Sequence, residues 1–367
     1  MQATNPLRPF LASITDKWLL YYDLAGVRTL TIHKLYCKYG LAVRVAPNEV
    51  LFSDVSVVSQ IYGQQTAFMK APIYDSMSVP PMGIFSLRDK AAHSQRRSLL
   101  SHAFSQQNVN DCMPTISHKV DLLLNAFRHE QGAVTDVLLL FRLFSFEVVG
   151  ELFLGTSFGA LETGTAPQFM HDMDRHFLLG GIEWSFPWLA ALLRMLPIPS
   201  LAHYLGARDR LAQFGNIALQ DYIQRYGRDT KRKDLLTKIL VPQGQAAAMT
   251  DRETFMEIGN LVFAGTAVFA DPTSFFPDRW LVGEPTAGQK TMFMPFSKGT
   301  RACLGKPLAM LELKLVVLAL MSRYKVKLPP QTTKDSMGLR DHFLVLPKSG
   351  KCELIFEPLE RDVASKA

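Results

Sequence analysis

The stretch "FMPFSKGTRACLGK", residues 293–306, places Cys303 in a loop with two glycines and an arginine at fixed offsets. An apolar helix is predicted to follow directly, over residues 306–328. A thiolate at a helix N-terminus is stabilised by the helix dipole and by free backbone N–H groups, which also tune any metal ion that the sulfur holds. The pattern favours a thiol placed for chemistry over its alternative, a buried structural cysteine beside a helix cap.

The other cysteines are scattered through the chain, at Cys37, Cys112 and Cys352. No pair has the C-x-x-C or C-x-x-x-C spacing, which excludes a zinc knuckle and a redox dithiol. Four separated cysteines in a chain of 367 residues without a signal peptide are typical of a reducing compartment. Cys303 is therefore expected to work as a single thiol.

The neighbours of Cys303 suit a flat ligand that carries carboxylates. Gly299 and Gly305 allow the backbone to approach such a ligand closely, and Arg301 can pair with a carboxylate. Phe296 would pack against an aromatic plane. A single thiolate in an apolar, aromatic loop is the arrangement of the fifth ligand of haem iron.

The segment "FSKGTRACLG" fills every position of F-x-x-G-x-R-x-C-x-G and resembles the haem-binding loop of the cytochrome P-450 monooxygenases. The resemblance implies haem b, with Cys303 as the axial iron ligand and Arg301 as a propionate partner. It also implies Phe296, Gly299 and Gly305 as haem contacts. The fold implied is the cytochrome P-450 fold, mainly α with minor β, incomplete here, in one domain over residues 1–367.

The resemblance extends to two further segments. "DKAAHSQRRSLLSHAFS", residues 89–105, resembles the helix over one haem face, where His93 and Arg97 stand one turn apart in the places of propionate-binding residues. Ala264, Gly265 and Thr266 match the start of [A/G]-G-x-[D/E]-T in the family's central helix. Ala264 and Gly265 are therefore counted with the cofactor-binding residues.

The sequence departs from the family after Thr266. Ala267 and Val268 stand where an acid and an alcohol relay protons to bound dioxygen, and neither side chain can do so. We therefore predict no catalytic acid/alcohol pair. None of the thirteen glutamates is followed by arginine three positions later, so the family's E-x-x-R motif is absent. The resemblance resumes at Asp271, which predicts an internal deletion near residues 267–270.

Hydrophobic periodicity predicts a mostly helical chain. The expected helices cover residues 31–40, 89–104, 111–130, 135–153, 166–180, 204–226, 255–270 and 306–328. The last-but-one of these helices is predicted to begin at Thr250, which forms a capping box with Glu253, and residues 255–270 continue it. Hairpins are expected over residues 41–54, around Pro47-Asn48, and over residues 342–358, around Ser349-Gly350.

The net charge of +7 and the pI of about 9.2 suit an acidic protein partner or an anionic membrane surface, and no nucleic-acid-binding motif is present. Residues 177–199 are interrupted by Glu183, Pro187 and Arg194, which excludes a spanning helix. Aromatic residues of that stretch fit a membrane interface and a protein core equally well. The start of the chain predicts neither signal peptide nor anchor, so we expect the cytoplasmic side of the endoplasmic reticulum by resemblance, or a peripheral or cytoplasmic location.

The leading hypothesis is a haem-thiolate monooxygenase. The resemblance implies oxidation of an apolar small molecule with O2 and electrons from an NADPH-dependent reductase, in fungal secondary metabolism. The alternative is a truncated, impaired remnant that binds haem weakly or not at all. A third hypothesis, haem-dependent isomerisation or peroxide use, ranks last because no acid is placed for peroxide activation.

Overall fold

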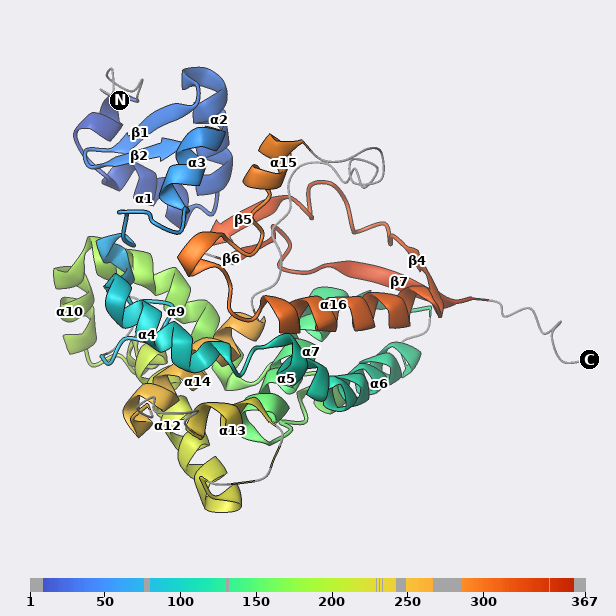
Figure 1. Cartoon of the computed structure of the whole chain (residues 1–367). Coiled ribbons are helices and arrows are strands. Elements are labelled where there is room, and N and C mark those ends of the chain that lie inside the picture. The colour runs from blue at the N-terminus through green and yellow to red at the C-terminus, as the bar shows by residue number, and fades with distance from the viewer. Residues whose placement is uncertain are drawn as a thin grey trace, which may run out of the picture.

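The computed structural model describes residues 9–75, 80–129, 132–228, 230, 232, 234–241, 249–266, 286–342 and 344–359. Most of these residues are helical (Figure 1). The α-helices are α1 (Lys17–Leu24), α2 (Arg28–Tyr39), α3 (Val55–Ile61), α4 (Lys90–Ser101), α5 (Gln106–Asp111), α6 (Met113–His129), α7 (Val137–Leu154), α8 (Ala160–Thr163), α9 (Gln168–Ser185), α10 (Pro187–Met195), α11 (Pro199–Leu205), α12 (Ala207–Tyr226), α13 (Leu235–Leu240), α14 (Asp251–Thr266), α15 (Ala287–Met292) and α16 (Lys306–Met321).

The strands form three small antiparallel sheets in the described part of the chain. β1 (Ala42–Ala46) pairs with β2 (Glu49–Phe52), and β5 (Leu339–His342) pairs with β6 (Leu344–Pro347). β7 (Glu353–Pro358) lies between β3 (Val134–Asp136) and β4 (Tyr324–Lys327). The prediction of a mainly α fold with minor β is confirmed.

Helix α7 is the centre of the core. Its sequence is apolar nearly all round, and it is buried among α6, α12, α13 and α14. Asp136 caps its start by accepting hydrogen bonds from the backbone N–H groups of Leu138 and Leu139. Gly155 ends it in the left-handed conformation, with φ of 61°. The two ends are thus set by local sequence, and the packing by the apolar surface between them.

Helix α16 carries the cysteine loop at its start. It packs on α5 and α6, and Figure 1 shows it crossing the molecule beside these helices, with β4 near its end. Unlike the predicted helix over 306–328, it ends at Met321. Residues 324–327, "YKVK", alternate apolar and charged side chains and form β4 instead, because a period of two suits a half-buried strand.

The two predicted hairpins had different outcomes. The first is confirmed, because Ala42 to Ala46 pairs with Glu49 to Phe52 around Pro47-Asn48. The second is wrong. β6 pairs with β5, the strand before it in the chain, whereas β7 pairs with β3 and β4. The segment around Ser349-Gly350 therefore joins two different sheets. Alternation predicts a strand but does not predict its partner.

The helix predictions hold apart from their ends. The capping box is confirmed: Thr250 N donates to Glu253 Oε2 at 2.9 Å, and Glu253 N donates to Thr250 Oγ1 at 3.3 Å. It starts α14 at Asp251, in agreement with the predicted start at Thr250. The remainder of the predicted helix, residues 267–270, lies outside the described residues. None of the described helices combines the length and apolar character needed to cross a bilayer.

Candidate functional site

The cysteine loop is a tight turn fixed by its own backbone. Cys303 N donates to Phe296 O at 2.8 Å, and Ala302 N donates to Gly299 O at 3.2 Å. These bonds close the loop around a short 3-10 turn, Gly299–Arg301. The chain then reaches Gly305, which is the N-cap of α16. Cys303 is exposed to solvent although its loop is ordered on both sides.

The sulfur of Cys303 lies at the N-terminus of α16, as the sequence predicts. The backbone N–H groups of Gly305 and Lys306 favour the ionised sulfur and so act to lower its pKa. Burial against the surrounding protein raises the pKa of the Cys303 thiol, while these N–H groups and the charges of Arg97 and Lys306 oppose the rise. The thiol therefore keeps its proton at neutral pH until a cation, such as a metal ion, displaces it.

The two glycines of the loop have different reasons to be glycine. Gly299 has φ of 65°, and a Cβ there would lie 2.0 Å from the backbone oxygen of Tyr62. The backbone at Gly299 therefore packs closely against the segment that follows α3. A Cβ at Gly305 would meet only ordinary contact, with Phe104 Cε1 at 3.9 Å. At Gly305 the described residues leave room beside the sulfur.

Helix α4 places His93 and Arg97 against the cysteine loop. Arg97 Nη1 donates to the carbonyl oxygen of Ala302, the residue directly before Cys303, at 2.7 Å. Arg301 donates to Leu87 O at 2.6 Å and to Arg88 O at 2.8 Å, in the segment that leads into α4. Three predicted residues from two distant segments therefore meet beside Cys303.

These cations repel one another. Burial, together with the charges of Arg301, Arg97 and Lys70, lowers the pKa of His93 to about 4, so its imidazole is neutral at pH 7. Burial also lowers the pKa of Arg301, an effect that exposed Asp89 partly opposes. An anionic ligand carrying two carboxylates would relieve this repulsion.

Lys70 belongs to the same cluster, and the sequence analysis missed it. Its amine donates to Phe85 O and lies over the rings of Tyr74 and Phe85, with Nζ 4.2 Å and 4.5 Å from their centroids. Burial and the charge of Arg301 lower the pKa of Lys70 to about 8. The partners of Lys70 lie in other segments of the chain, so no local motif predicts its place in the site.

These residues fit haem. Haem is flat and carries two carboxylates, and its iron takes a thiolate. The described site offers an exposed sulfur at a helix N-terminus and a group of mutually repelling cations beside it. It also offers Phe296, whose ring centroid lies 5.8 Å from Lys306 Nζ. Ala264 and Gly265 lie in the last turn of α14, while Ala267 and Val268 lie outside the described residues.

Comparison with known families decides the relationship. The sequence model of the cytochrome P-450 family matches residues 18–268 and 266–354. This chain belongs to the cytochrome P-450 family. The family implies a haem-thiolate cofactor, O2, a redox partner and an apolar substrate, and it makes the chain an oxidoreductase of the monooxygenase type. The two matched stretches meet at residues 266–268, where the sequence analysis predicts a deletion.

The relatives include cytochrome P-450 monooxygenases of fungi. The chain is 23% identical to the monooxygenase FCK2 of Fusarium pseudograminearum, over 92% of this chain and 79% of the relative. It is 24% identical to tryprostatin B 6-hydroxylase of Neosartorya fischeri, over 89% and 77%. The alignment with FCK2 runs over 439 residues, more than the 367 of this chain.

Solved structures agree on the fold. The haem domain of cytochrome P-450DA superposes with a TM-score of 0.73 at 12% identity, covering 93% of this chain and 95% of that one. Retinoic acid bound cyanobacterial CYP120A1 gives a TM-score of 0.67 at 15% identity, covering 89% and 94%. At such identities these likenesses show the cytochrome P-450 fold alone.

Proposed function

We propose that this cytochrome P-450 holds haem b through Cys303 and oxidises an apolar small molecule with O2 and electrons from an NADPH-dependent reductase. The observation that carries the proposal is the meeting of an exposed thiol at a helix N-terminus with a cationic cluster beside its loop. Haem, when bound, supplies the activation of O2 at a thiolate-ligated iron. Similarity to tryprostatin B 6-hydroxylase of Neosartorya fischeri supports a substrate from fungal secondary metabolism.

Each residue of the site has a stated task. Cys303 would give up its proton to hold the haem iron, and the N–H groups of Gly305 and Lys306 would stabilise the thiolate. Arg97 and Arg301 would pair with the propionates, and neutral His93 would donate or accept one hydrogen bond there. We assign Phe296, Gly299, Gly305, Ala264 and Gly265 to the remaining haem contacts, in agreement with the resemblance.

Docking of the reductase is assigned to the cationic surface at the start of α16. Lys306 is exposed and would face an acidic partner. Lys298 is less available, because its amine already donates to Lys290 O and Thr291 O, both at 2.7 Å. Of the two lysines beside the loop, Lys306 is therefore the one placed for docking.

Haem titration of the purified chain tests the proposal. We expect a reduced carbon-monoxide difference spectrum with the Soret band of thiolate ligation, and its loss in Cys303→Ala. Cys37→Ala is the matched control, because Cys37 is also exposed but lies on α2. Haem uptake without a thiolate-type spectrum, or an unchanged spectrum in Cys303→Ala, contradicts the assignment.

The second candidate is an impaired remnant of a longer enzyme, in one haem-binding domain that lacks an internal block. The split of the family match at 266–268 and the length of the FCK2 alignment support it. Ala267 and Val268 leave the proton relay without an acid and an alcohol. We expect turnover with reductase and NADPH to be weak or uncoupled from product. Inserting the corresponding block of FCK2 after Thr266 should raise coupling; full coupling without it rejects this candidate.

Peripheral membrane contact is proposed through residues 177–199. Helix α10 exposes Trp188, Leu192 and Met195 along one face, at 66%, 52% and 81%. Tyr21 of α1 is also exposed, one turn from Lys17, whose amine donates to Ser185 O at the end of α9. The side chain of Trp184 lies outside the described set, and Phe186 is half-buried beneath Lys17.

Vesicle flotation tests this contact. The parent chain should float with anionic vesicles, and the triple variant Trp188→Ser, Leu192→Ser and Met195→Ser should not, because it removes the apolar face of α10. A triple Ser variant at Val317, Leu318 and Met321 of α16 is the control. Equal flotation of the α10 variant and the parent would exclude this face. A bound fraction would favour a peripheral location, on the cytoplasmic side of the endoplasmic reticulum by resemblance.

A further inference from the structure

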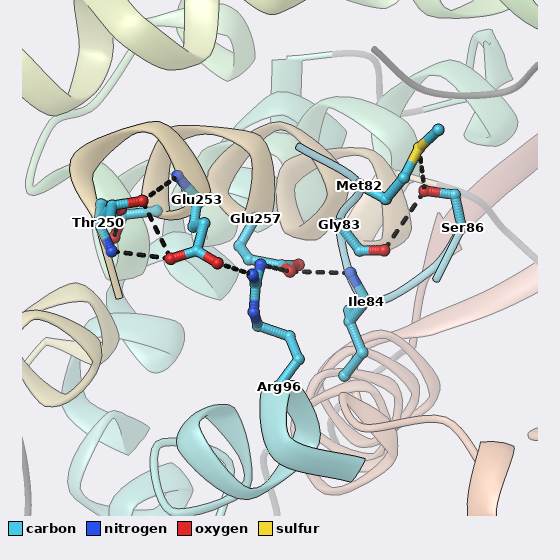
Figure 2. Close-up of polar contacts among 9 residues, drawn as sticks. Met82, Gly83, Ile84, Ser86, Arg96, Thr250, Glu253 and Glu257 are labelled. Atoms are coloured by element: carbon cyan, nitrogen blue, oxygen red, sulfur yellow. Dashed lines mark hydrogen bonds and ion pairs between the residues drawn. The ribbon is translucent and has the colours of Figure 1, made fainter. Parts of the chain in front are cut away.

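Helix α4 carries a second arginine, Arg96, that faces away from the cysteine loop. Its side chain is 9% exposed and lies between two glutamates of α14 (Figure 2). Arg96 Nη1 donates to Glu257 Oε1 at 2.8 Å, and Nη2 donates to Glu253 Oε1. Glu257 is 1% exposed, so this ion pair is buried. Arg96 is separated from Glu257 by most of the middle of the chain, and local sequence could not have predicted the pair.

Glu257 holds a second segment with the same oxygen. Ile84 N donates to Glu257 Oε1 at 2.8 Å, and Figure 2 shows the arginine and the Ile84 backbone converging on this one carboxylate. Glu253 is itself fixed, because its other oxygen accepts from Thr250 N at 2.9 Å and from Thr250 Oγ1 at 3.0 Å. The start of α14 therefore presents a rigid pair of acceptors to α4 and to the segment around Ile84.

Both segments continue to the cysteine loop. On α4, the residue after Arg96 is Arg97, which donates to Ala302 O at 2.7 Å. Beyond Ile84, the carbonyls of Leu87 and Arg88 accept from Arg301 at 2.6 Å and 2.8 Å. Glu257 is thus joined by two separate routes to the two residues that lie one and two places before Cys303.

We propose that Glu257 and Arg96 are positioning residues that fix the separation between the cysteine loop and α14, and with it the slot that receives haem. This rests on the proposed function for the identity of the ligand. A buried carboxylate that accepts two hydrogen bonds has little freedom to move, because each unmade bond would leave a polar group buried without a partner. The pair also neutralises Arg96, so that its charge does not add to that of Arg97 and Arg301.

Hydrogen exchange on the chain without added haem is the first test. In Glu257→Gln, which keeps an acceptor for Ile84 but removes the charge that binds Arg96, amides of residues 294–304 should exchange about tenfold faster. Glu147→Gln of α7 is the matched control, because Glu147 is equally buried and its partner Lys119 lies on α6. It should leave exchange in the cysteine loop unchanged. Equal acceleration in both variants, or none in Glu257→Gln, overturns the proposal.

Haem affinity is the second test. The dissociation constant for haem should rise about tenfold in Glu257→Gln and less than about twofold in Glu147→Gln. Arg96→Lys, which keeps the charge but not the two-pronged contact, should be intermediate in both measurements and serves if Glu257→Gln fails to fold. A parent that takes up no haem contradicts the proposed function and leaves the exchange experiment to decide the positioning role. Unchanged loop exchange in Arg96→Lys and Glu257→Gln contradicts the positioning role alone.

Discussion

Helices α7 and α16 have the same kind of sequence and different surroundings. Both are apolar almost all round, which predicts a helix covered on every side. α7 is covered, with Phe146 1% exposed and stacked on Phe158 at 4.6 Å. α16 is covered only on its inner face: Val317, Leu318 and Met321 are 55%, 68% and 51% exposed. The contrast shows that an apolar helix sequence does not by itself decide how much of the helix surface is covered.

The buried glutamates of the two helices differ in the same way. Burial would raise the pKa of Glu147 on α7, but hydrogen bonds from Ser157, Lys119 and the backbone of Ala160 lower it overall. Burial raises the pKa of Glu312 on α16 to about 8, with only a weak opposing effect from the Ser145 hydroxyl, whose oxygen lies 3.3 Å from Glu312 Oε2. The covered helix has a complete polar network, and the half-covered one carries a carboxyl held in its neutral form.

The largest effect is expected in the covered helix. Phe146→Ala should lower the free energy of unfolding by about 3–5 kcal/mol, because it opens a cavity between Phe158 and Phe169. Urea titration followed by far-ultraviolet circular dichroism measures the loss. A loss below about 1 kcal/mol would mean that α7 is no better packed than α16 and would remove the contrast between them.

A smaller effect, dependent on pH, is expected at Glu312. Since its folded pKa lies above the unfolded value, the folded chain binds the proton more tightly, and stability falls as pH rises between about 4.5 and 8. Glu312→Gln removes this dependence. At pH 9 its free energy of unfolding should be about 1–2 kcal/mol larger than that of the parent, and at pH 5 the two should be nearly equal.

Urea titrations at the two pH values measure the effect of Glu312→Gln. Glu147→Gln is the control with the opposite sign: its lowered pKa contributes stability above the unfolded pKa, which is lost as pH falls. It should therefore destabilise the chain at pH 9. Parallel pH profiles for the parent and Glu312→Gln would contradict the assignment of a neutral carboxyl.

The smallest effect is expected on the outer face of α16. Leu318→Gln should change the free energy of unfolding by less than about 0.5 kcal/mol, because the side chain is already 68% exposed. It should also reduce self-association in size-exclusion chromatography, since it interrupts an apolar patch. A cost near that of Phe146→Ala would show that this face is covered in solution.

Local sequence predicted the parts of the site that are close together in the chain. The turn around Cys303 follows from Gly299 and Gly305, and the helix ends follow from Asp136, Gly155 and Thr250. The family resemblance brought His93 and Arg97 to the same site, and α4 places Arg97 on Ala302.

What the sequence could not predict depends on contacts across long stretches of chain. Lys70 is recognisable only once Phe85 and Arg301 are beside it, and the strand partners of β7 lie more than two hundred residues away at one edge. The early end of α16 was within reach, because "YKVK" alternates with the period of a strand. The helix prediction followed the long apolar run before this segment and therefore extended too far.

The contact between Gly299 and Tyr62 has a consequence for assembly. The backbone oxygen of Tyr62 fills the space where any side chain at position 299 would stand. The cysteine loop therefore packs directly against the backbone at the end of α3. Tyr62 and Gly299 are more than two hundred residues apart in the sequence. The position of the cysteine loop therefore depends on the N-terminal part of the chain. A substitution that displaces Tyr62 should therefore shift the loop that carries Cys303, although none of the described N-terminal residues bonds to the sulfur.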